Sequence, residues 1–533
     1  MLHIEVVIGL LAGVALLGAI AERAGLPYAA VLVIGGLVLG LAPGVPHVRL
    51  DPELVLLGFL PPLVFAAAFE ASNYDLRANA GHIISLATVL VLVTVGAVAV
   101  IGHAVAGLPW VAAFVLGALA APTDPVSAGA VMRQAGAPER ILAILEGESL
   151  INDGTGLAAF QVAVGAAAGA ISIETGIARF VIYAVGGCAI GLAGGWILVW
   201  LRRRLDEASL EIVLSLLAAF GTYAAANAAG CSAVLAAVTA GLYAGRRAED
   251  MSSASTRVQT QPFWEALKFM LESTLFLLVG LQLPTIVDGL PGDALGAGIA
   301  EGAAIVAVVL LVRAGWMLVL WVVPALSSLP GRMSRRLGEV PIAAERLSGR
   351  ELIVLGYSGM RGALSLAGAL SIPLIAGGRP FPARDEVIFL VYVVVIGTLL
   401  IPSLSLEPLV RRLGLAGDER LAELELRIRA RIVHAALARL EELAEQGVAA
   451  EETVQRLRAT FELRLDRIGG PERDGALSEG AADAAAVVRR LRSELIDAER
   501  RALEELREEH GLPAQILARI HRDIDLDETR LHV

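Results

Sequence analysis

Two short polar segments interrupt long apolar runs, and their side chains could bind a cation or a proton. One runs from Glu148 to Gly154, and the other from Pro122 to Ser127. A carboxylate at the centre of a bilayer costs roughly 2.5–3.5 kcal/mol on insertion scales. A chain tolerates that cost where the charge is paired or takes part in ion or proton transport. The two segments therefore indicate a transport site.

Helical spacing gathers the polar side chains of the later segment into one stripe. In a helix, Glu148 and Asn152 share a face, and Ser149 and Asp153 form the adjacent pair. Hard oxygen donors suit hard cations, and here we expect Na⁺, Li⁺ or a proton. A carboxylate in a low-dielectric cavity holds a proton more readily than in water, so proton and cation compete for it. The alternative is a buried polar network that only holds helices together.

The earlier segment is expected to break a membrane helix. Pro122 and Pro125 disfavour a continuous helix. Asp124 is suited to an N-cap, with Pro125 at the first helical position. Free carbonyls near Thr123 could then coordinate a cation, and Asp124 could cap the positive helix end. A simple proline kink is the alternative.

Two arginines inside apolar runs need acidic partners, because an unpaired arginine is costly in a membrane. We expect Arg313 to pair with Glu148, which leaves Asp153 free for ion exchange. Arg361 is the rival partner. For both arginines, an ion pair that orients helices is favoured over direct contact with the ion.

Two further acids accompany the apolar runs. Glu272 lies within one run, and Glu70 stands at the end of another. For Glu70 we favour a place at the membrane interface over a cavity-lining role.

The composition is that of a polytopic membrane protein. Of the 533 residues, 56% are hydrophobic, the mean hydropathy is +0.69, and the apolar residues come in long runs. No basic stripe with interleaved aromatics suggests nucleic-acid binding, and we expect no cofactor. Cys188 and Cys231 have no disulfide or metal spacing. An intramembrane enzyme would need a nucleophile with a base or a metal cluster, and His82 and His103 lie near opposite ends of one run.

The apolar runs predict about 13 membrane-spanning helices. Their approximate positions are 4–21, 28–42, 53–71, 82–106, 109–132, 141–170, 179–201, 208–228, 231–245, 262–283, 297–325, 351–376 and 386–410.

Loop arginines predict the orientation, because cytoplasmic loops are enriched in them. With the N-terminus outside, about 15 loop arginines lie inside and about 4 outside. The inner set is Arg23, Arg77, Arg133, Arg140, Arg202, Arg203, Arg204, Arg246, Arg247, Arg257, Arg332, Arg335, Arg336, Arg346 and Arg350, and the outer set is Arg49, Arg179, Arg379 and Arg384. An odd number of spans then places the C-terminus in the cytoplasm.

The chain changes character after Arg411 and Arg412. From about residue 417 to 526 it predicts amphipathic helices with many Glu–Arg pairs at helical spacing. Breaks are expected at 469–471 and 511–513. We therefore predict an exchanger domain over 1–411 and a cytoplasmic helical tail over 412–533. The tail packs on itself or on a second subunit; a regulatory binding module is the alternative.

Five segments together resemble the monovalent cation:proton antiporters of the sodium/proton exchanger type, including the NhaP-like bacterial branch. They occur in the family's order, and the resemblance spans about residues 5–410. The segments are Phe59 to Phe65, Thr123 to Val126, Glu148 to Gly154, Leu271 to Gly280, and Gly359 to Ala363.

The resemblance implies an all-α fold of 13 membrane helices in two inverted repeats with crossed, broken helices, in which a core domain moves against a dimerisation domain. It also implies residue roles. Asp153 would be the exchanging carboxylate, and Ser149 and the Thr123 carbonyl would bind the ion with it. Asp124 and Asn152 would support the crossing of the broken helices. Glu148 and Arg313 would form the buried ion pair of the family.

The residue before Asp153 bears on stoichiometry. Asn152 resembles the electroneutral branch, whereas the electrogenic branch has two adjacent aspartates there. The chain departs from many animal relatives at Ala66, where they have an acid, and Glu70 lies about one turn further on. Relatives vary between Asn and Glu where Glu272 stands.

We therefore predict an electroneutral Na⁺(Li⁺)/H⁺ antiporter that works by alternating access and serves pH homeostasis, with Na⁺ bound at Asp153. It would be a homodimer in the bacterial inner membrane and not an enzyme, with the lipid bilayer as its surroundings. A K⁺/H⁺ antiporter of the same fold is the alternative, because the ligand types do not exclude K⁺. A channel would instead conduct without proton coupling.

Overall fold

The computed structural model describes residues 4–42, 53–167, 173–205, 207–247, 254–287, 294–326, 347–415, 419–446, 451–468, 482–510 and 514–532. The chain forms two compact units. One comprises Met1–Leu205, Ile212–Met251 and Phe263–Gly417, and the other comprises Asp206–Glu211, Ser252–Pro262 and Asp418–Val533. We call them the membrane unit and the tail unit.

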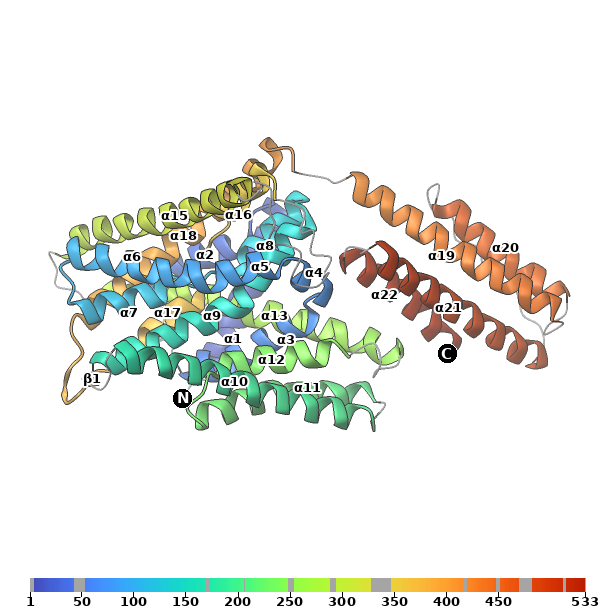
Figure 1. Ribbon diagram of the computed structural model, residues 1–533, viewed down its shortest axis with the longest axis horizontal. Coiled ribbons are helices and arrows are strands. Elements are labelled where there is room, and N and C mark those ends of the chain that lie inside the picture. The colour runs from blue at the N-terminus through green and yellow to red at the C-terminus, as the bar shows by residue number, and fades with distance from the viewer. Residues whose placement is uncertain are drawn as a thin grey trace. The chain divides into compact units, whose positions relative to one another are not determined.

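In its described residues, the membrane unit consists of helices, the turns that join them and one short hairpin (Figure 1). Its helices before the polar segments are α1 (Ile4–Ala24), α2 (Tyr28–Leu41), η1 (Leu54–Phe59), α3 (Leu60–Glu70), α4 (Asn73–Ala78), α5 (Ala80–Ile84), η2 (Ser85–Leu90) and α6 (Val91–Ala104). They are followed by α7 (Trp110–Ala120), α8 (Pro125–Ala135), α9 (Glu139–Ala167), α10 (Ile173–Arg202), α11 (Ala208–Ala228), α12 (Ala233–Gly245), α13 (Ala254–Leu281), α14 (Leu283–Val287), α15 (Ala294–Leu326), α16 (Gly349–Tyr357), α17 (Ala363–Leu370) and α18 (Arg384–Arg412).

Each of the predicted spans overlaps a helix or consecutive helices. Among the described residues, 7 helices are long and apolar enough to cross a membrane. These are Glu5–Ala24, Ala80–Ala104, Trp110–Ala135, Phe180–Arg202, Ala208–Ala228, Leu295–Val322 and Arg384–Arg412, joined by the shorter apolar helices Tyr28–Leu41, Leu54–Glu70 and Ala233–Gly245. The number of crossings stays a prediction.

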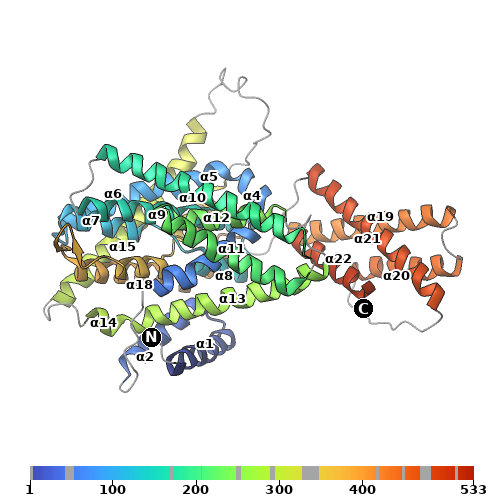
Figure 2. The ribbon, with the colours of Figure 1, turned by 90° about the horizontal axis from the view of Figure 1, so that it is seen from below.

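Small residues let the N-terminal helices pack closely against α13, a grouping that is visible in Figure 2. A Cβ added to Gly36 of α2 would lie 2.3 Å from the carbonyl oxygen of Leu277, and one on Gly280 would lie 2.2 Å from that of Val33. Because only glycine fits at such distances, α2 and α13 meet backbone to backbone.

Two of the predicted spans are interrupted at their centres. The span predicted at 109–132 divides into α7 and α8, as Pro122 and Pro125 lead one to expect. The span predicted at 351–376 was wrong at its end, because α17 stops at Leu370. Residues Ile375–Ala376 and Arg379–Pro380 form β1 and β2, an antiparallel hairpin closed by two glycines with positive φ, Gly377 and Gly378.

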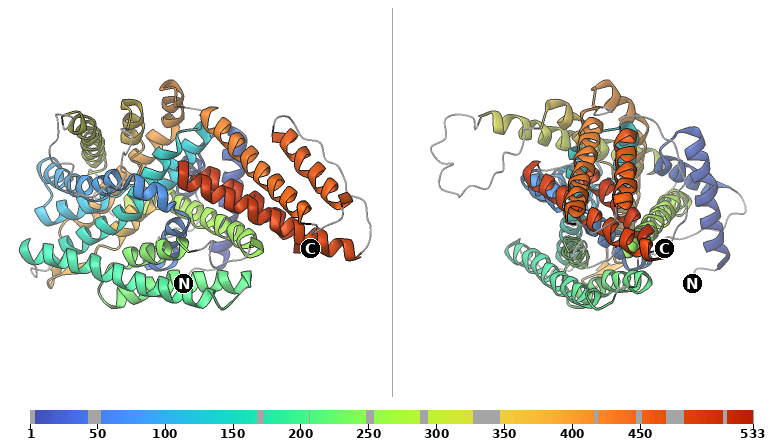
Figure 3. Two further views of the ribbon diagram at one scale, coloured as in Figure 1. Left: turned by 45° about the vertical axis from the view of Figure 1, so that its right-hand side comes forward. Right: turned by 90° about the vertical axis from the view of Figure 1, so that its right-hand side faces the viewer.

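The tail unit contains α19 (Glu419–Glu445), α20 (Glu451–Ile468), α21 (Ala482–His510) and α22 (Ala514–His532). Helices α19 and α21 lie side by side (Figure 3). A core of aliphatic residues, including Ile432, Leu440 and Leu495, is buried among these helices. Charged pairs such as Arg439–Glu494 and Arg429–Asp523 join one helix to another at the surface.

Some sequence predictions fall outside the described residues. These are the breaks at 469–471 and 511–513 and the loop arginines Arg49, Arg332, Arg335, Arg336 and Arg346.

Candidate functional site

The break between α7 and α8 is organised by Asp124. Its carboxylate accepts hydrogen bonds from the backbone N–H of Val126 at 2.9 Å and from the Ser127 hydroxyl at 3.3 Å. Pro125 occupies the first turn of α8, where its missing N–H costs nothing. Asp124 is therefore the N-cap of α8, and its negative charge meets the positive end of that helix.

The break in a second helix contacts the first break at this point, and we call this contact the crossing. Helices α16 and α17 are separated by residues 358–362, and the backbone N–H of Asp124 donates to the Met360 carbonyl at 2.8 Å. A Cβ on Gly362 would lie 2.6 Å from the Asp124 Oδ2 atom and 2.8 Å from its Cβ. The crossing thus depends on glycine at position 362.

Arg361 supports the crossing from the side of α7. Its guanidinium is buried and donates to the carbonyl of Ala120, at the end of α7, at 3.0 Å. It also donates to the Gly359 carbonyl. Arg361 thereby satisfies carbonyls that a broken helix leaves without partners, which are intolerable in lipid. It forms no ion pair with a described residue.

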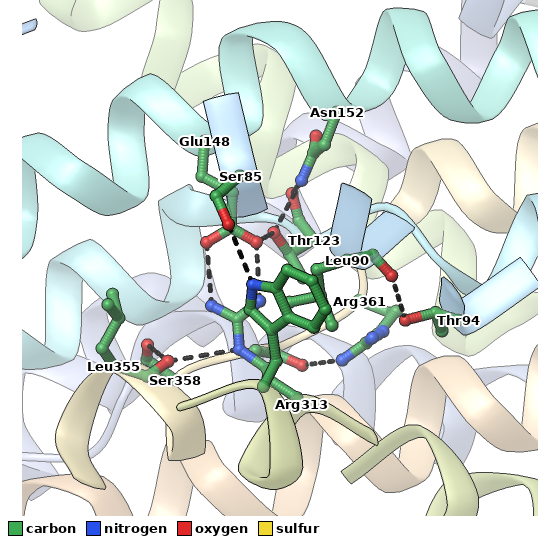
Figure 4. A network of polar contacts seen from close by, with 12 residues as sticks. Ser85, Leu90, Thr94, Thr123, Glu148, Asn152, Arg313, Leu355, Ser358 and Arg361 are labelled. Carbon is green, nitrogen blue, oxygen red and sulfur yellow. Dashed lines mark hydrogen bonds and ion pairs between the residues drawn. The ribbon is translucent and has the colours of Figure 1, made fainter. Parts of the chain in front are cut away.

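The structure brings Glu148 and Arg313 together as a buried, bidentate pair (Figure 4). Arg313 Nη1 lies 2.6 Å from Glu148 Oε1, and Nη2 lies 2.9 Å from Oε2. The side chains are only 2% and 1% exposed. Arg313 also donates from Nε to the Leu355 carbonyl at 3.2 Å. The pair therefore ties α9 and α15 to α16.

Thr123 links this pair to the neighbouring turn of α9. Its hydroxyl donates to Glu148 Oε1 at 3.0 Å and accepts from the Asn152 amide at 2.7 Å. That amide also approaches the Thr123 carbonyl oxygen at 3.4 Å (Figure 4). Asn152 is fully buried, and its Oδ1 atom has no hydrogen-bond partner in the described part of the chain. An unpaired buried acceptor is costly unless a cation or water completes it.

Asp153 follows Asn152 and is partly exposed, in contrast to its buried neighbours. Its carboxylate makes no ion pair or hydrogen bond with a described residue, although the negative charge of Asp124 acts on it. Helix α9 approaches the break closely here: a Cβ on Gly156 would lie 2.3 Å from Pro122 Cγ and 3.1 Å from the Ala118 carbonyl oxygen. Asp153 is thus an ionisable group beside the crossing that has no counter-ion among the described residues.

The remaining predicted residues lie in three different surroundings. Ser149 is buried on α9, one turn before Asp153. Glu272 of α13 accepts a hydrogen bond from the Tyr28 hydroxyl of α2 at 3.4 Å. Glu70, at the end of α3, pairs with Lys268 and is exposed. The structure therefore gives Glu70 an ion-pair partner away from the polar cluster.

Sequence reasoning missed several partners that the fold supplies. Met360 and Leu355 act through their carbonyl oxygens, and a backbone atom leaves no mark in a side-chain pattern. Tyr28 was also missed. The spacing of Gly359 and Gly362 around Arg361 was the available signal for the second break.

Comparison with known proteins identifies the class of protein to which this chain belongs. The family model described as "Sodium/hydrogen exchanger, transmembrane" matches residues 10–412. The chain belongs to this family of membrane-embedded transporters.

Two relatives and one solved structure illustrate the similarity. An uncharacterised Na⁺/H⁺ exchanger of Mycobacterium tuberculosis is 32% identical over 99% of this chain and 96% of its own length. The Na⁺/H⁺ antiporter ApNhaP of Aphanothece halophytica is 33% identical over 74% of this chain and 71% of its own. The sodium proton antiporter MjNhaP1 of Methanocaldococcus jannaschii has a similar fold, with a TM-score of 0.60, 18% identity, and coverage of 77% of this chain and 98% of that one.

Proposed function

We propose that this protein exchanges Na⁺ for H⁺ across the membrane, with Asp153 as the group that binds either ion. The observation that carries the proposal is a contrast between two carboxylates on α9. Glu148 is neutralised by the bidentate contact with Arg313, whereas Asp153 has no ion-pair partner among the described residues. The relatives are named as Na⁺/H⁺ exchangers or antiporters, which supports the same activity here.

Alternating access follows from the cost of moving a bare charge. A carboxylate without a counter-ion would cross the low-dielectric barrier at high cost, but its sodium-bound or proton-bound form would not. The core of the protein would then cross only when Asp153 is neutralised. Since one carboxylate binds one Na⁺ or one H⁺, the exchange would be electroneutral. Asn152 contributes no second charge to the site.

The ligand set we propose for Na⁺ or Li⁺ consists of Asp153, the Ser149 hydroxyl and the Thr123 carbonyl. Asp124 would hold the crossing in place as the cap of α8. Asn152 would orient Thr123 through its amide, and its unpartnered Oδ1 atom is a further oxygen available to the site. The potassium alternative is not favoured, because the family model and the two relatives described above are named for sodium and not for potassium.

The wider arrangement is proposed on the ground of the family. It consists of 13 membrane helices in two inverted repeats, a homodimer in the bacterial inner membrane, an external N-terminus and a cytoplasmic tail. The C-terminal arginines of α10 and α12 and the many arginines of the inner loops favour this orientation.

The test is proton flux in proteoliposomes reported by a pH-sensitive dye. Na⁺, Li⁺ and K⁺ are added in turn, with the membrane potential clamped and unclamped. We expect Na⁺ and Li⁺ to drive proton flux that is the same with and without the clamp. A response to K⁺ alone would assign the protein to the potassium alternative. A response that changes with the clamp would rule out electroneutral exchange.

A further inference from the structure

Helix α17 is short and has few side chains that could interlock with its neighbours. It contains eight residues, Ala363–Leu370, five of which are alanine, glycine or serine. It packs against α7 and α18, and a Cβ on Gly368 would lie 2.5 Å from Leu119 Cδ2. Helices interlock where ridges of side chains on one fit into grooves on the other. Because α17 has few such side chains, its position along its own axis depends mainly on contacts at its two ends.

The first end of α17 is part of the crossing. Gly362, the N-cap, lies against the Asp124 carboxylate, and Asp124 donates its backbone N–H to the Met360 carbonyl. Asp124 follows Thr123, whose carbonyl is one of the ligands proposed above for Na⁺. A shift of α17 along its axis would therefore move the backbone next to that ligand.

The other end of α17 is closed by hydrogen bonds to its last four carbonyls, which have no partners within a helix. Backbone N–H groups of the next two residues donate to the carbonyls at positions 367–369. The Leu370 carbonyl accepts from Arg384 Nη2 at 3.1 Å. The Ile372 carbonyl, just beyond the helix, accepts from Arg384 Nε at 2.8 Å. Arg384 thus completes the closure of this end.

The turn before Arg384 directs its side chain to α17. Ala383 has a φ of 51°, in the left-handed region that residues other than glycine rarely adopt. Such a conformation persists where the surrounding structure requires it. The guanidinium brings a positive charge to the negative end of α17, and the side chain is only 22% exposed. Hydrogen bonds from a charged donor are stronger than neutral ones, so Arg384 joins α17 firmly to the 29-residue helix α18.

We propose that Arg384 is a positioning residue for the ion site. By holding the last turn of α17, it keeps Thr123 and Asp124 in the geometry that binds Na⁺. This role rests on the proposed function and adds to it a residue outside the crossing that sets ion affinity and selectivity. Arg384 itself does not touch the ion. The competing explanation is a helix cap that only stabilises the fold.

The test compares the full-length wild type with Arg384→Gln in proteoliposomes, by proton flux driven by Na⁺ or Li⁺ and normalised to folded protein. We expect the apparent KM for each ion to rise about two- to tenfold, which corresponds to the net contribution of one hydrogen bond. The ratio of the two KM values should move towards one, because a less rigid site discriminates less between ions of different size. A cap that only stabilises the fold would lower the unfolding temperature and leave both KM values unchanged.

Two nearby variants serve as matched controls. Arg379→Gln removes the same charge from the hairpin, where Arg379 is exposed and its side chain forms no ion pair or hydrogen bond with a described residue. Asp385→Asn removes the charge that contacts Arg384 Nη1 at 3.2 Å and leaves both carbonyl contacts in place. Both variants should have the KM values of the wild type. Wild-type KM values in Arg384→Gln, or an equal rise in Arg379→Gln, would overturn the proposal.

A second measurement does not depend on transport. Amide hydrogen exchange at Asp124 and at residues 363–372 is followed by mass spectrometry in detergent. We expect faster amide exchange at both places in Arg384→Gln. The milder variant Arg384→Lys keeps the charge but loses the planar fork of donors, so it should fold and lie between the wild type and Arg384→Gln. Unchanged amide exchange at Asp124 in both variants would overturn the proposal.

The two measurements separate this role from the proposed function. If the wild type shows no flux driven by Na⁺, the proposed function fails. Faster amide exchange at Asp124 in Arg384→Gln would still show that Arg384 holds the crossing in place.

Discussion

The membrane unit and the tail unit each contain arginine–carboxylate pairs, and one pair from each unit shows how far their surroundings can differ. Arg313 and Glu148 are 2% and 1% exposed and meet through two contacts. Arg456 and Glu452, on the tail helix α20, are 72% and 78% exposed. The two pairs therefore join the same chemical groups, one pair buried inside the protein and the other exposed to water.

The difference in burial changes how much an ion pair contributes to stability. In the tail, water already solvates both partners, so such a pair contributes about 0–1 kcal/mol to stability. In the membrane unit, each buried charge is costly alone and must be matched by a specific partner. An unmatched carboxylate there, such as Asp153, is therefore a sign of function.

The largest expected effect comes from removing that unmatched carboxylate. Asp153→Asn keeps the size of the side chain and removes the group that would bind Na⁺ or H⁺. We expect Na⁺-dependent proton flux in proteoliposomes to fall to background, with folding and dimerisation intact. Asp385→Asn is the control, because Asp385 is exposed and pairs with Arg384 at the start of α18; it should transport normally. Substantial residual flux in Asp153→Asn would refute the assignment.

We expect that breaking the buried pair lowers the stability of the protein more than it impairs ion exchange. Arg313→Gln leaves Glu148 buried without its counter-ion, which should lower the free energy of unfolding by about 3–5 kcal/mol. Thermal unfolding in detergent would measure it. Replacing Glu148 as well, by Glu148→Gln, removes the unpaired charge and should restore part of the lost free energy of unfolding. A double variant that is as unstable as Arg313→Gln, or less stable, would argue against a paired charge.

The crossing of the broken helices can be tested by adding one methyl group. In Gly362→Ala, the new Cβ would meet Asp124, so we expect a loss of about 1–3 kcal/mol in stability and a reduced rate of exchange. Gly349→Ala is the control, since a Cβ there meets no atom within 4 Å. Equal transport rates in the two variants would show that the crossing tolerates the shift.

The smallest effect is expected on the surface of the tail. Arg456→Gln removes an exposed pair within α20 and should change stability by less than about 1 kcal/mol. Arg439→Gln should cost more, because Arg439 contacts Glu442 and also Glu494, which joins α19 to α21. Denaturation followed by circular dichroism would rank the two variants. If Arg456→Gln is the more destabilising of the two, the contact between Arg439 and Glu494 does not stabilise the packing of α19 on α21.

Much of the helical framework was predictable from the chain. The apolar runs anticipated the helices, because a membrane-length apolar run has few other solutions. The prolines at 122 and 125 anticipated the break before α8. The second break was not located, because its signal is two glycines around Arg361, and glycine occurs at many other positions in these helices. The residues between α17 and the hairpin were mistaken for the end of a span, because residues 372–376 are mostly apolar.

The sequence by itself determined which residues are out of place in a membrane: Asp124, Glu148, Asp153 and Arg313. The energetic cost of a buried charge depends on residue type and on the length of the surrounding apolar run, and both are readable from the chain. Only the tertiary structure decided that Arg313 meets Glu148, that Arg361 meets carbonyl oxygens, and that Asp153 meets no described partner. Those outcomes depend on where helices cross, and crossing is set by contacts between segments as distant as Asp124 and Met360.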